Sequence, residues 1–257
     1  MRLINPPIMT YKLLLALTFL PISLAQAQEQ DAKEIVRRAD EKMRGESSYA
    51  ELSMTIIRPS WSREVSMKSW SLHTEYALIL ITGPARDKGT ATLKRDKELW
   101  NWQPSIDRVI KLPPSMMLQS WMGSDFTNDD LVQESSIVSD YDHQLLGEET
   151  IDDHLCYKIE LTPKPDAPVV WGRILIWISK ADYLQLRTEF YDEEDDLVNT
   201  MYGKAIKVMD GKLLPSVLEM IPADEPGHKT VITYKDLKFG IDIDKHFFSV
   251  QNMKRVR

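Results

Sequence analysis

Cysteine is nearly absent from this sequence: Cys156 is the only one among 257 residues. A single cysteine cannot form a disulfide within the chain, so the fold must be stabilised by a buried core. Cys156 falls inside an expected strand, and we interpret it as a small buried apolar residue, with a catalytic thiol as the second interpretation.

Long apolar runs are also missing beyond the first residues of the chain. The run Leu13–Ala25 is shorter than the roughly 20 residues that a bilayer-spanning helix needs, and Pro21 interrupts it. Arg2 and Lys12 precede this run and Ala25-Gln26-Ala27 closes it, which is typical of a secretory signal peptide rather than a membrane anchor.

We therefore predict that residues 1–27 are a signal peptide, cleaved between Ala27 and Gln28. Residues 28–257 are expected to form one domain that works outside the cytoplasm. Removing the leader takes away two basic residues and no acidic one, so the net charge goes from −7 to −9. An acidic chain of this kind lacks the basic footprint of a nucleic-acid binder, and we expect no nucleic-acid partner.

Recognisable catalytic and metal-binding motifs are missing as well. The five histidines are dispersed without an HExxH pair, the serines lack a G-x-S-x-G elbow, and no glycine-rich phosphate loop is present. The acidic run 192–196 lacks the spacing and glycine of a calcium loop, and we place it at a solvated hairpin end. We predict no metal, no cofactor and no enzymatic activity.

The residues that are present predict a mostly β protein. Asp31–Arg44 has helical apolar spacing, a capping pair of Asp31 and Glu34, and Gly45 at its end. Short alternating segments with turn signals between them then predict an antiparallel meander. The expected strands cover residues 48–59, 63–72, 76–82, 90–94, 98–103, 107–111, 141–148, 154–162, 172–179, 183–192, 197–208, 212–220 and 228–239.

Two of these strands are apolar on both sides: YALILIT at Tyr76–Thr82 and RILIWIS at Arg173–Ser179. Such strands indicate a sheet that is covered on both faces. Helices can cover one face, while the other can face a second protein layer or a cavity, and periodicity does not separate these alternatives.

The segment Arg108–Val132 reads as a flap laid on the sheet rather than as a core element. Pro113 and Pro114 exclude the centre of a sheet, and Gly123 interrupts any helix. We predict a mobile lid whose hinges are Pro113, Pro114 and Gly123, because an open apolar pocket would otherwise expose an aggregation-prone patch. Its large apolar side chains, which suit adaptable contacts, are Met116, Met117, Trp121, Met122 and Phe126.

The last part of the flap contains the acidic residues Asp125, Asp129 and Asp130. They fit helix caps, a patch facing a partner, or metal ligands. We favour caps, with Thr127 or Asn128 beginning a short helix.

Seven tryptophans lie mostly at sheet positions. Trp100 and Trp102 alternate in one strand, so their rings share a face. Ordinary sheet packing explains each indole alone, but the set together with the flap fits an acyl-chain pocket. Besides the flap residues, we predict that this cavity is lined by Trp70, Leu78, Leu80, Trp100, Trp102 and Trp177.

These motifs resemble a known family. SWMGSDF at Ser120–Phe126, preceded by LPPS at Leu112–Ser115 and followed by Asp129-Asp130-Leu131, is similar to the signature of outer-membrane lipoprotein-sorting proteins. The later run WISKADYLQLRTEFYD at Trp177–Asp192 is similar too. The flap is typical of the exporter-associated branch of these LolA-like proteins, which makes true lipoproteins a doubtful cargo.

The resemblance implies a strongly curved antiparallel sheet in the form of an incomplete half barrel, with an N-terminal helix and a short helical lid on its concave side, as in LolA and LolB. It also implies a periplasmic monomer that binds a lipid, lipoprotein acyl chain or other hydrophobic ligand. The implied partner is an inner-membrane RND/MMPL-type exporter, with only transient membrane contact.

Our leading hypothesis is a carrier that passes such cargo toward the outer membrane. The alternative is a non-carrying interaction or sensor module that binds a lipidated protein or an exporter domain. A hydrolase that acts on an envelope lipid is a third hypothesis, because catalytic triads are recognised by geometry rather than by sequence motif.

Overall fold

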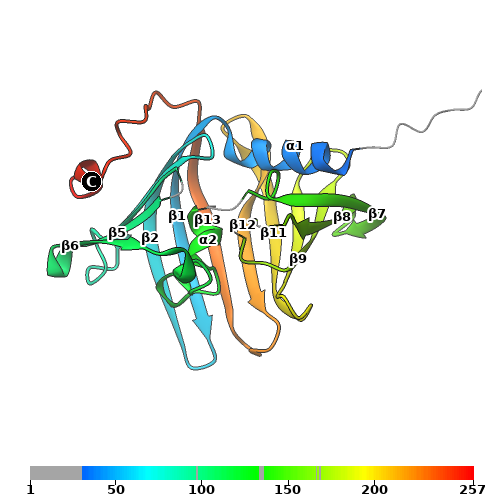
Figure 1. Ribbon diagram of the computed structural model, residues 1–257, viewed down its shortest axis with the longest axis horizontal. Helices are drawn as coiled ribbons and strands as arrows, with labels where there is room; N and C mark the ends of the chain where they lie inside the picture. Colours follow the sequence, from blue (N-terminus) through cyan, green and yellow to red (C-terminus); the bar gives the residue numbers. More distant parts are fainter. Residues whose placement is uncertain (1–30, 97, 133–135, 166, 168) are drawn as a thin grey trace, which may run out of the picture.

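The computed structural model describes residues 31–96, 98–132, 136–165, 167 and 169–257. Most of these residues belong to one curved antiparallel sheet (Figure 1). Its strands are β1 (Ser47–Arg58), β2 (Trp61–Leu72), β3 (Tyr76–Gly83), β4 (Ala91–Arg95), β5 (Glu98–Gln103), β6 (Arg108–Leu112), β7 (Tyr141–Ile151), β8 (His154–Pro163), β9 (Arg173–Ser179), β10 (Gln185–Tyr191), β11 (Leu197–Met209), β12 (Lys212–Pro222) and β13 (Lys229–Phe239). The helices are α1 (Ala32–Arg44), α2 (Asn128–Val132) and α3 (Val250–Met253), with short 3-10 turns at Pro104–Ile106, Pro114–Met116 and Trp121–Gly123.

The strand order places the first and last strands side by side in the middle of the sheet. The order is β6-β5-β4-β3-β2-β1-β13-β12-β11-β10-β9-β8-β7. Ser48 pairs with Phe239 at one end of the β1–β13 ladder and Ile57 pairs with Lys229 at the other. The sheet edges are therefore β6 and β7, which are consecutive in sequence and are connected by the segment that contains α2. The sheet is open, as the predicted half barrel requires.

The concave face holds the main hydrophobic core. Even-numbered residues of β1, such as Met54 and Ile56, meet Ile174 and Ile176 of β9 and Leu161 of β8 in one buried cluster. Helix α1 lies across the open side of the sheet against β7 and β9 and adds Ile35 and Val36 to this cluster, while α2 and its flanking loop lie lower in the concavity (Figure 1).

The two ends of helix α1 are set by its capping residues. The Asp31 side chain accepts a hydrogen bond from the Lys33 backbone N–H at 3.0 Å, and Gly45 ends the helix with φ 67°. Glu34, the predicted capping partner of Asp31, has other partners. Its carboxylate accepts hydrogen bonds from Arg37 and Arg38 rather than from the backbone N–H of Asp31.

The convex face is covered at β2–β5 by the residues after β13. Phe248 and Met253 are buried against Leu78, Leu80 and Leu93, and the Phe247 ring lies 5.5 Å from the Trp70 ring. This C-terminal strap, residues 240–257, runs along the outside of the sheet near β5 (Figure 1). A second convex cluster surrounds Trp177 and Cys156.

The curved, mostly β half barrel is as predicted, and each expected strand is present with its ends shifted by at most a few residues. Both doubly apolar strands are covered on two faces: β3 sends Ile79 and Ile81 to the concave core and Leu78 and Leu80 to the convex cluster. Cys156 is fully buried among apolar residues, and burial raises the pKa of its thiol.

The predicted signal peptide and the Ala27–Gln28 cleavage site lie outside the described residues. Within the part of the chain that the structure describes, no helix has the length and apolar character needed to cross a bilayer.

Candidate functional site

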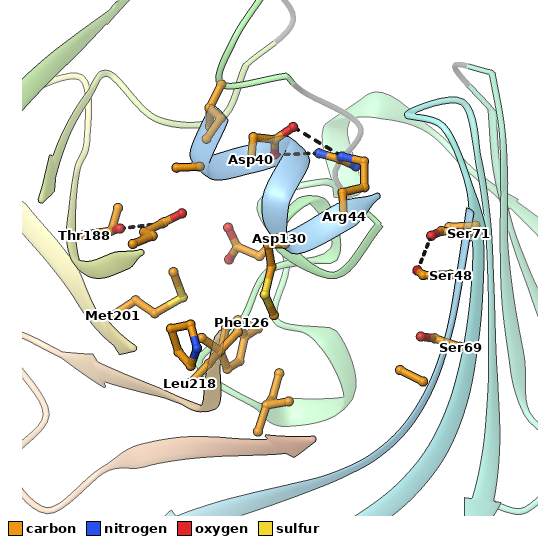
Figure 2. Close-up of a pocket in the computed structure, with 18 of the residues that line it drawn as sticks. Asp40, Arg44, Ser48, Ser69, Ser71, Phe126, Asp130, Thr188, Met201 and Leu218 are labelled. Carbon is orange, nitrogen blue, oxygen red and sulfur yellow. Dashed lines mark hydrogen bonds and ion pairs between the residues drawn. The ribbon is translucent and has the colours of Figure 1, made fainter. Parts of the chain in front are cut away.

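A cavity of about 310 Å³ lies between the concave face of the sheet, α1 and the loop before α2 (Figure 2). The size is at the lower end of the range found for small-molecule sites, about 300–1,000 Å³. Most of its wall is apolar. The apolar wall residues include Ala39 and Met43 of α1, Phe126 of the loop, and Leu52, Met67, Ile79, Leu161, Ile174, Ile176, Phe190, Met201, Leu218, Met220, Ile232 and Leu237 of the sheet.

Polar side chains on one part of the wall are paired with each other. Arg44 Nη2 and Asp40 Oδ1 are 2.9 Å apart on α1, and the Ser48 and Ser71 hydroxyls are 2.7 Å apart on β1 and β2 (Figure 2). The Tyr234 hydroxyl has no hydrogen-bond partner among the described residues, and burial raises its pKa to about 12. The wall is therefore mainly apolar, but it also carries further polar side chains, among them Ser69, His73, Thr74, Gln185 and Thr188.

Two carboxylates of α2, Asp129 and Asp130, also line the cavity. Asp130 forms a reciprocal cap with Thr127: its Oδ2 accepts from the Thr127 backbone N–H at 2.8 Å, and its own N–H donates to the Thr127 hydroxyl at 3.1 Å. This is the capping role that the sequence favoured. Burial raises the pKa of Asp130 to about 6, although the Thr127 hydrogen bonds oppose that rise.

Trp171 stands beside this acidic pair. The side chain is 5% exposed, lines the cavity, and packs on Phe190 with ring centroids 5.0 Å apart. It lies near enough to Asp130 to lower the pKa of that carboxyl slightly, but no described acceptor meets its Nε1–H at hydrogen-bonding geometry. The cavity thus has a buried indole donor that lies beside a carboxylate without a hydrogen bond of regular geometry.

The loop before α2 is a compact turn built from the SWMGSDF motif. Trp121 N–H donates to the Phe126 carbonyl at 2.8 Å, and the Ser120 hydroxyl donates to the Ser124 carbonyl at 2.5 Å. Met122 and Gly123 both adopt left-handed backbone conformations, with φ 53° and 77°. Glycine accommodates this conformation freely, so the sharp turn falls at Gly123.

A buried ion pair fastens this loop to the sheet. Arg58 at the end of β1 makes two hydrogen bonds to the Asp125 carboxylate, at 2.9 and 3.0 Å, and a third to the Gly123 carbonyl at 3.0 Å. Thr230 of β13 donates to Asp125 at 2.6 Å, and Arg63 of β2 donates to the Met122 carbonyl. The two charged side chains are only 12% and 6% exposed. We call this set of contacts the Arg58 latch.

Of the five predicted lid residues, one lines the cavity and the other four belong to the concave hydrophobic core or pack against it. Phe126 lines the cavity, but Met117 and Trp121 are buried in the concave core and Met116 and Met122 pack against it. Pro113 and Pro114 lead into the 3-10 turn Pro114–Met116. Hinge motion at these prolines and at Gly123 stays a prediction.

Five residues predicted to line the cavity lie on the convex face instead. Leu78, Leu80, Trp100 and Trp102 pack with the C-terminal strap, and Trp177 belongs to the other convex cluster, where its Nε1 donates to Glu149. Their placement as wall residues was wrong. Strand alternation correctly put Trp100 and Trp102 on one face, but alternation does not say which face is concave.

Trp70 has an intermediate position. It contributes to the cavity wall, but its ring packs between Tyr49 and Phe247 on the convex side, at 5.5 Å from each.

Several wall residues escaped the sequence prediction, among them Asp129, Asp130, Trp171 and Tyr234. The two aspartates were noticed only as caps. Trp171 precedes β9 outside any periodic segment, so no pattern assigned it to a face. In the described residues, no cluster of three His, Cys, Asp or Glu side chains has a geometry that could hold a metal ion.

The open half barrel, with its concave cavity and overlying helix, places this protein in the LolA-like class of folds. A DUF1329 family protein from Desulfovibrio piger superposes with a TM-score of 0.79 at 27% identity, covering 86% of this chain and 97% of the other. A LolA superfamily protein from Nitrosomonas europaea gives 0.75 at 26% identity, covering 86% and 98%. An outer membrane lipoprotein-sorting protein domain from Vibrio parahaemolyticus gives 0.78 at 23% identity, covering 87% and 98%, and at that identity shows the fold alone.

A family model described as "uncharacterized protein" matches residues 73–255, which include the whole SWMGSDF loop, and the chain belongs to that family. No curated protein matches the sequence.

Proposed function

We propose that this protein is a periplasmic carrier that binds one hydrophobic molecule, such as a lipid or the acyl chain of a lipoprotein, and passes it toward the outer membrane. It works as a monomer, touches membranes only transiently, and receives its cargo from an inner-membrane RND/MMPL-type exporter. The supporting observation is the cavity of about 310 Å³, whose mainly apolar wall is formed by the concave face of the sheet, α1 and Phe126 of the loop before α2.

Apolar burial supplies the driving force for such a carrier. Each buried methylene contributes on the order of 0.8 kcal/mol, so an acyl chain leaves a membrane only for a comparable apolar surface. Binding alone gives no direction, because a carrier moves cargo only toward a site of higher affinity or under work done by a transporter. The exporter in this proposal rests on the resemblance of the Ser120–Phe126 loop to the exporter-associated branch.

Native mass spectrometry tests the carrier. The protein, purified from a periplasmic fraction without detergent, should carry a mass that organic solvent releases. An empty protein that stays empty after incubation with envelope lipids, while a protein partner co-purifies in stoichiometric amount, would instead support the non-carrying interaction module.

A pair of variants localises the site. Met201 lines the cavity and Val208, on the same strand, is exposed. Met201→Trp should fill the cavity and abolish binding of a fluorescent acyl probe, whereas Val208→Trp adds an indole outside and should leave binding unchanged. Equal binding by both variants would place the ligand elsewhere and contradict the cavity as the carrier site.

A further inference from the structure

The charge of the cavity wall limits which ligand head it accepts. Among the described wall residues, Arg44 is the only one with a permanent positive charge, and Asp40 already neutralises it at 2.9 Å. Asp129 and Asp130 add two carboxylates. A fatty acid or a phosphate head placed here would meet like charge in a poorly hydrated space, which costs free energy that no wall cation offsets.

The Trp171 indole sets a second requirement. Its Nε1–H is buried beside the Asp130 carboxylate, whose pKa it lowers, but it makes no hydrogen bond of regular geometry among the described residues. A buried donor left unpaired costs about 1–3 kcal/mol, so a ligand that supplies an acceptor gains affinity there. A protonated amine would pair with the Asp130 carboxylate but has no lone pair for the indole.

A hydroxyl group meets both requirements, because it donates one hydrogen bond and accepts another. Building on the carrier function proposed above, we infer that the cargo is an uncharged lipid alcohol whose hydroxyl donates to Asp130 and accepts from Trp171, while its apolar body occupies the wall formed by Met201, Leu218 and Phe126.

The test compares ligands that differ only in their head. A long-chain primary alcohol, the fatty acid and the alkylamine of equal carbon number each displace a fluorescent acyl probe from the intact protein at neutral pH. The alcohol should bind at least tenfold more tightly than the fatty acid and more tightly than the amine. A fatty acid or an amine that binds as well as the alcohol overturns the inference.

Two variants assign the preference to named atoms. Asp130→Asn keeps an oxygen for the Thr127 cap but loses the charge, so the preference for alcohol over fatty acid should shrink about tenfold. Trp171→Phe keeps an aromatic ring but loses the N–H, so alcohol affinity should fall about tenfold while the fatty acid remains weak. Trp177→Phe, on the convex face, is the matched control and should change neither affinity.

The outcomes separate this inference from the carrier proposal. If all three ligands bind equally and Met201→Trp blocks them, the cavity carries apolar cargo but the hydroxyl anchor is wrong. If the probe itself does not bind, the carrier proposal fails and the anchor fails with it. If the probe binds but none of the three ligands displaces it, the anchor alone is wrong. Should Trp171→Phe not fold, as judged by circular dichroism, the Asp130→Asn comparison decides alone.

Discussion

At the scale of single residues, the Arg58 latch joins the SWMGSDF loop to the sheet. Asp125 binds Arg58 and Thr230, which belong to neighbouring strands β1 and β13, so one carboxylate joins the loop to the centre of the sheet. A buried pair of this kind adds little compared with apolar residues of the same shape, but removing one partner leaves the other charge buried alone.

Asp125→Asn should therefore lower the free energy of unfolding by about 3 kcal/mol, since Arg58 keeps its charge without a counter-ion. Urea denaturation followed by circular dichroism measures this loss. Glu64→Gln is the matched control: Glu64 pairs with Lys235 at 3.4 Å with both side chains more than half exposed, and its removal should change the free energy by less than about 1 kcal/mol. A double variant, Arg58→Met with Asp125→Leu, should recover most of the lost stability. Equal losses of unfolding free energy in Asp125→Asn and Glu64→Gln would show that the latch stabilises the fold no more than an exposed ion pair does.

Asp130 gives stability a dependence on pH. Its folded-state pKa of about 6 lies above the ordinary value of 3.8, so between pH 4 and 6 the folded chain binds more protons at this site than the unfolded chain. This contribution to stability is complete below about pH 4 and is lost as the pH rises through 6. Asp130→Asn should remove it, leaving the variant more stable than the parent at pH 7 by up to about 3 kcal/mol, with the difference falling below about 1 kcal/mol near pH 4. Denaturation curves across this range measure the difference, and a constant difference at all pH values would contradict it.

At the scale of elements, the C-terminal strap acts as a second layer for half of the sheet. Phe248 is fully buried against β3 and β4 residues, and Lys254 lies 4.6 Å from the Trp102 ring centroid. Without the strap, Leu78, Leu80 and Leu93 would form an apolar patch on the outside of the molecule.

Phe248→Ala should lower the free energy of unfolding by about 3–5 kcal/mol, because it opens a cavity under the strap. His246→Ala, two residues away and exposed, should change it by less than about 0.5 kcal/mol. Thermal denaturation compares them, and binding of a dye specific for exposed apolar surface should rise only in Phe248→Ala. A Phe248 variant as stable as the His246 variant would mean that the strap is not a structural layer.

The elements could be predicted from the sequence more fully than the site could. Strand alternation in β1 and the Asp31 and Gly45 caps of α1 are local signals, and they gave elements close to those observed. The face to which Trp102 or Trp177 turns depends on the direction in which the sheet curves and on where the strap lies, and both are long-range properties. The same holds for Trp171, which reaches the cavity from an irregular segment.

At the scale of the whole molecule, the sheet consists of two meanders joined at one ladder. β1–β6 and β7–β13 each connect neighbours in sequence, whereas β1 and β13 pair across nearly the whole chain. Since long-range pairing must wait for the intervening chain to close, refolding should take milliseconds to seconds or longer. Stopped-flow tryptophan fluorescence measures this rate, and completion in microseconds would contradict a rate-limiting β1–β13 ladder.

The same ladder has a consequence for the protein during its synthesis. β1 is among the first strands to leave the ribosome, and the partner for one of its edges is among the last. Until β13 has been made, the growing chain cannot assemble its central pairing, and Asp125 has no Thr230 to bind. The nascent protein therefore cannot complete its sheet until translation is almost finished, and the edge of β1 that pairs with β13 stays open for most of that time.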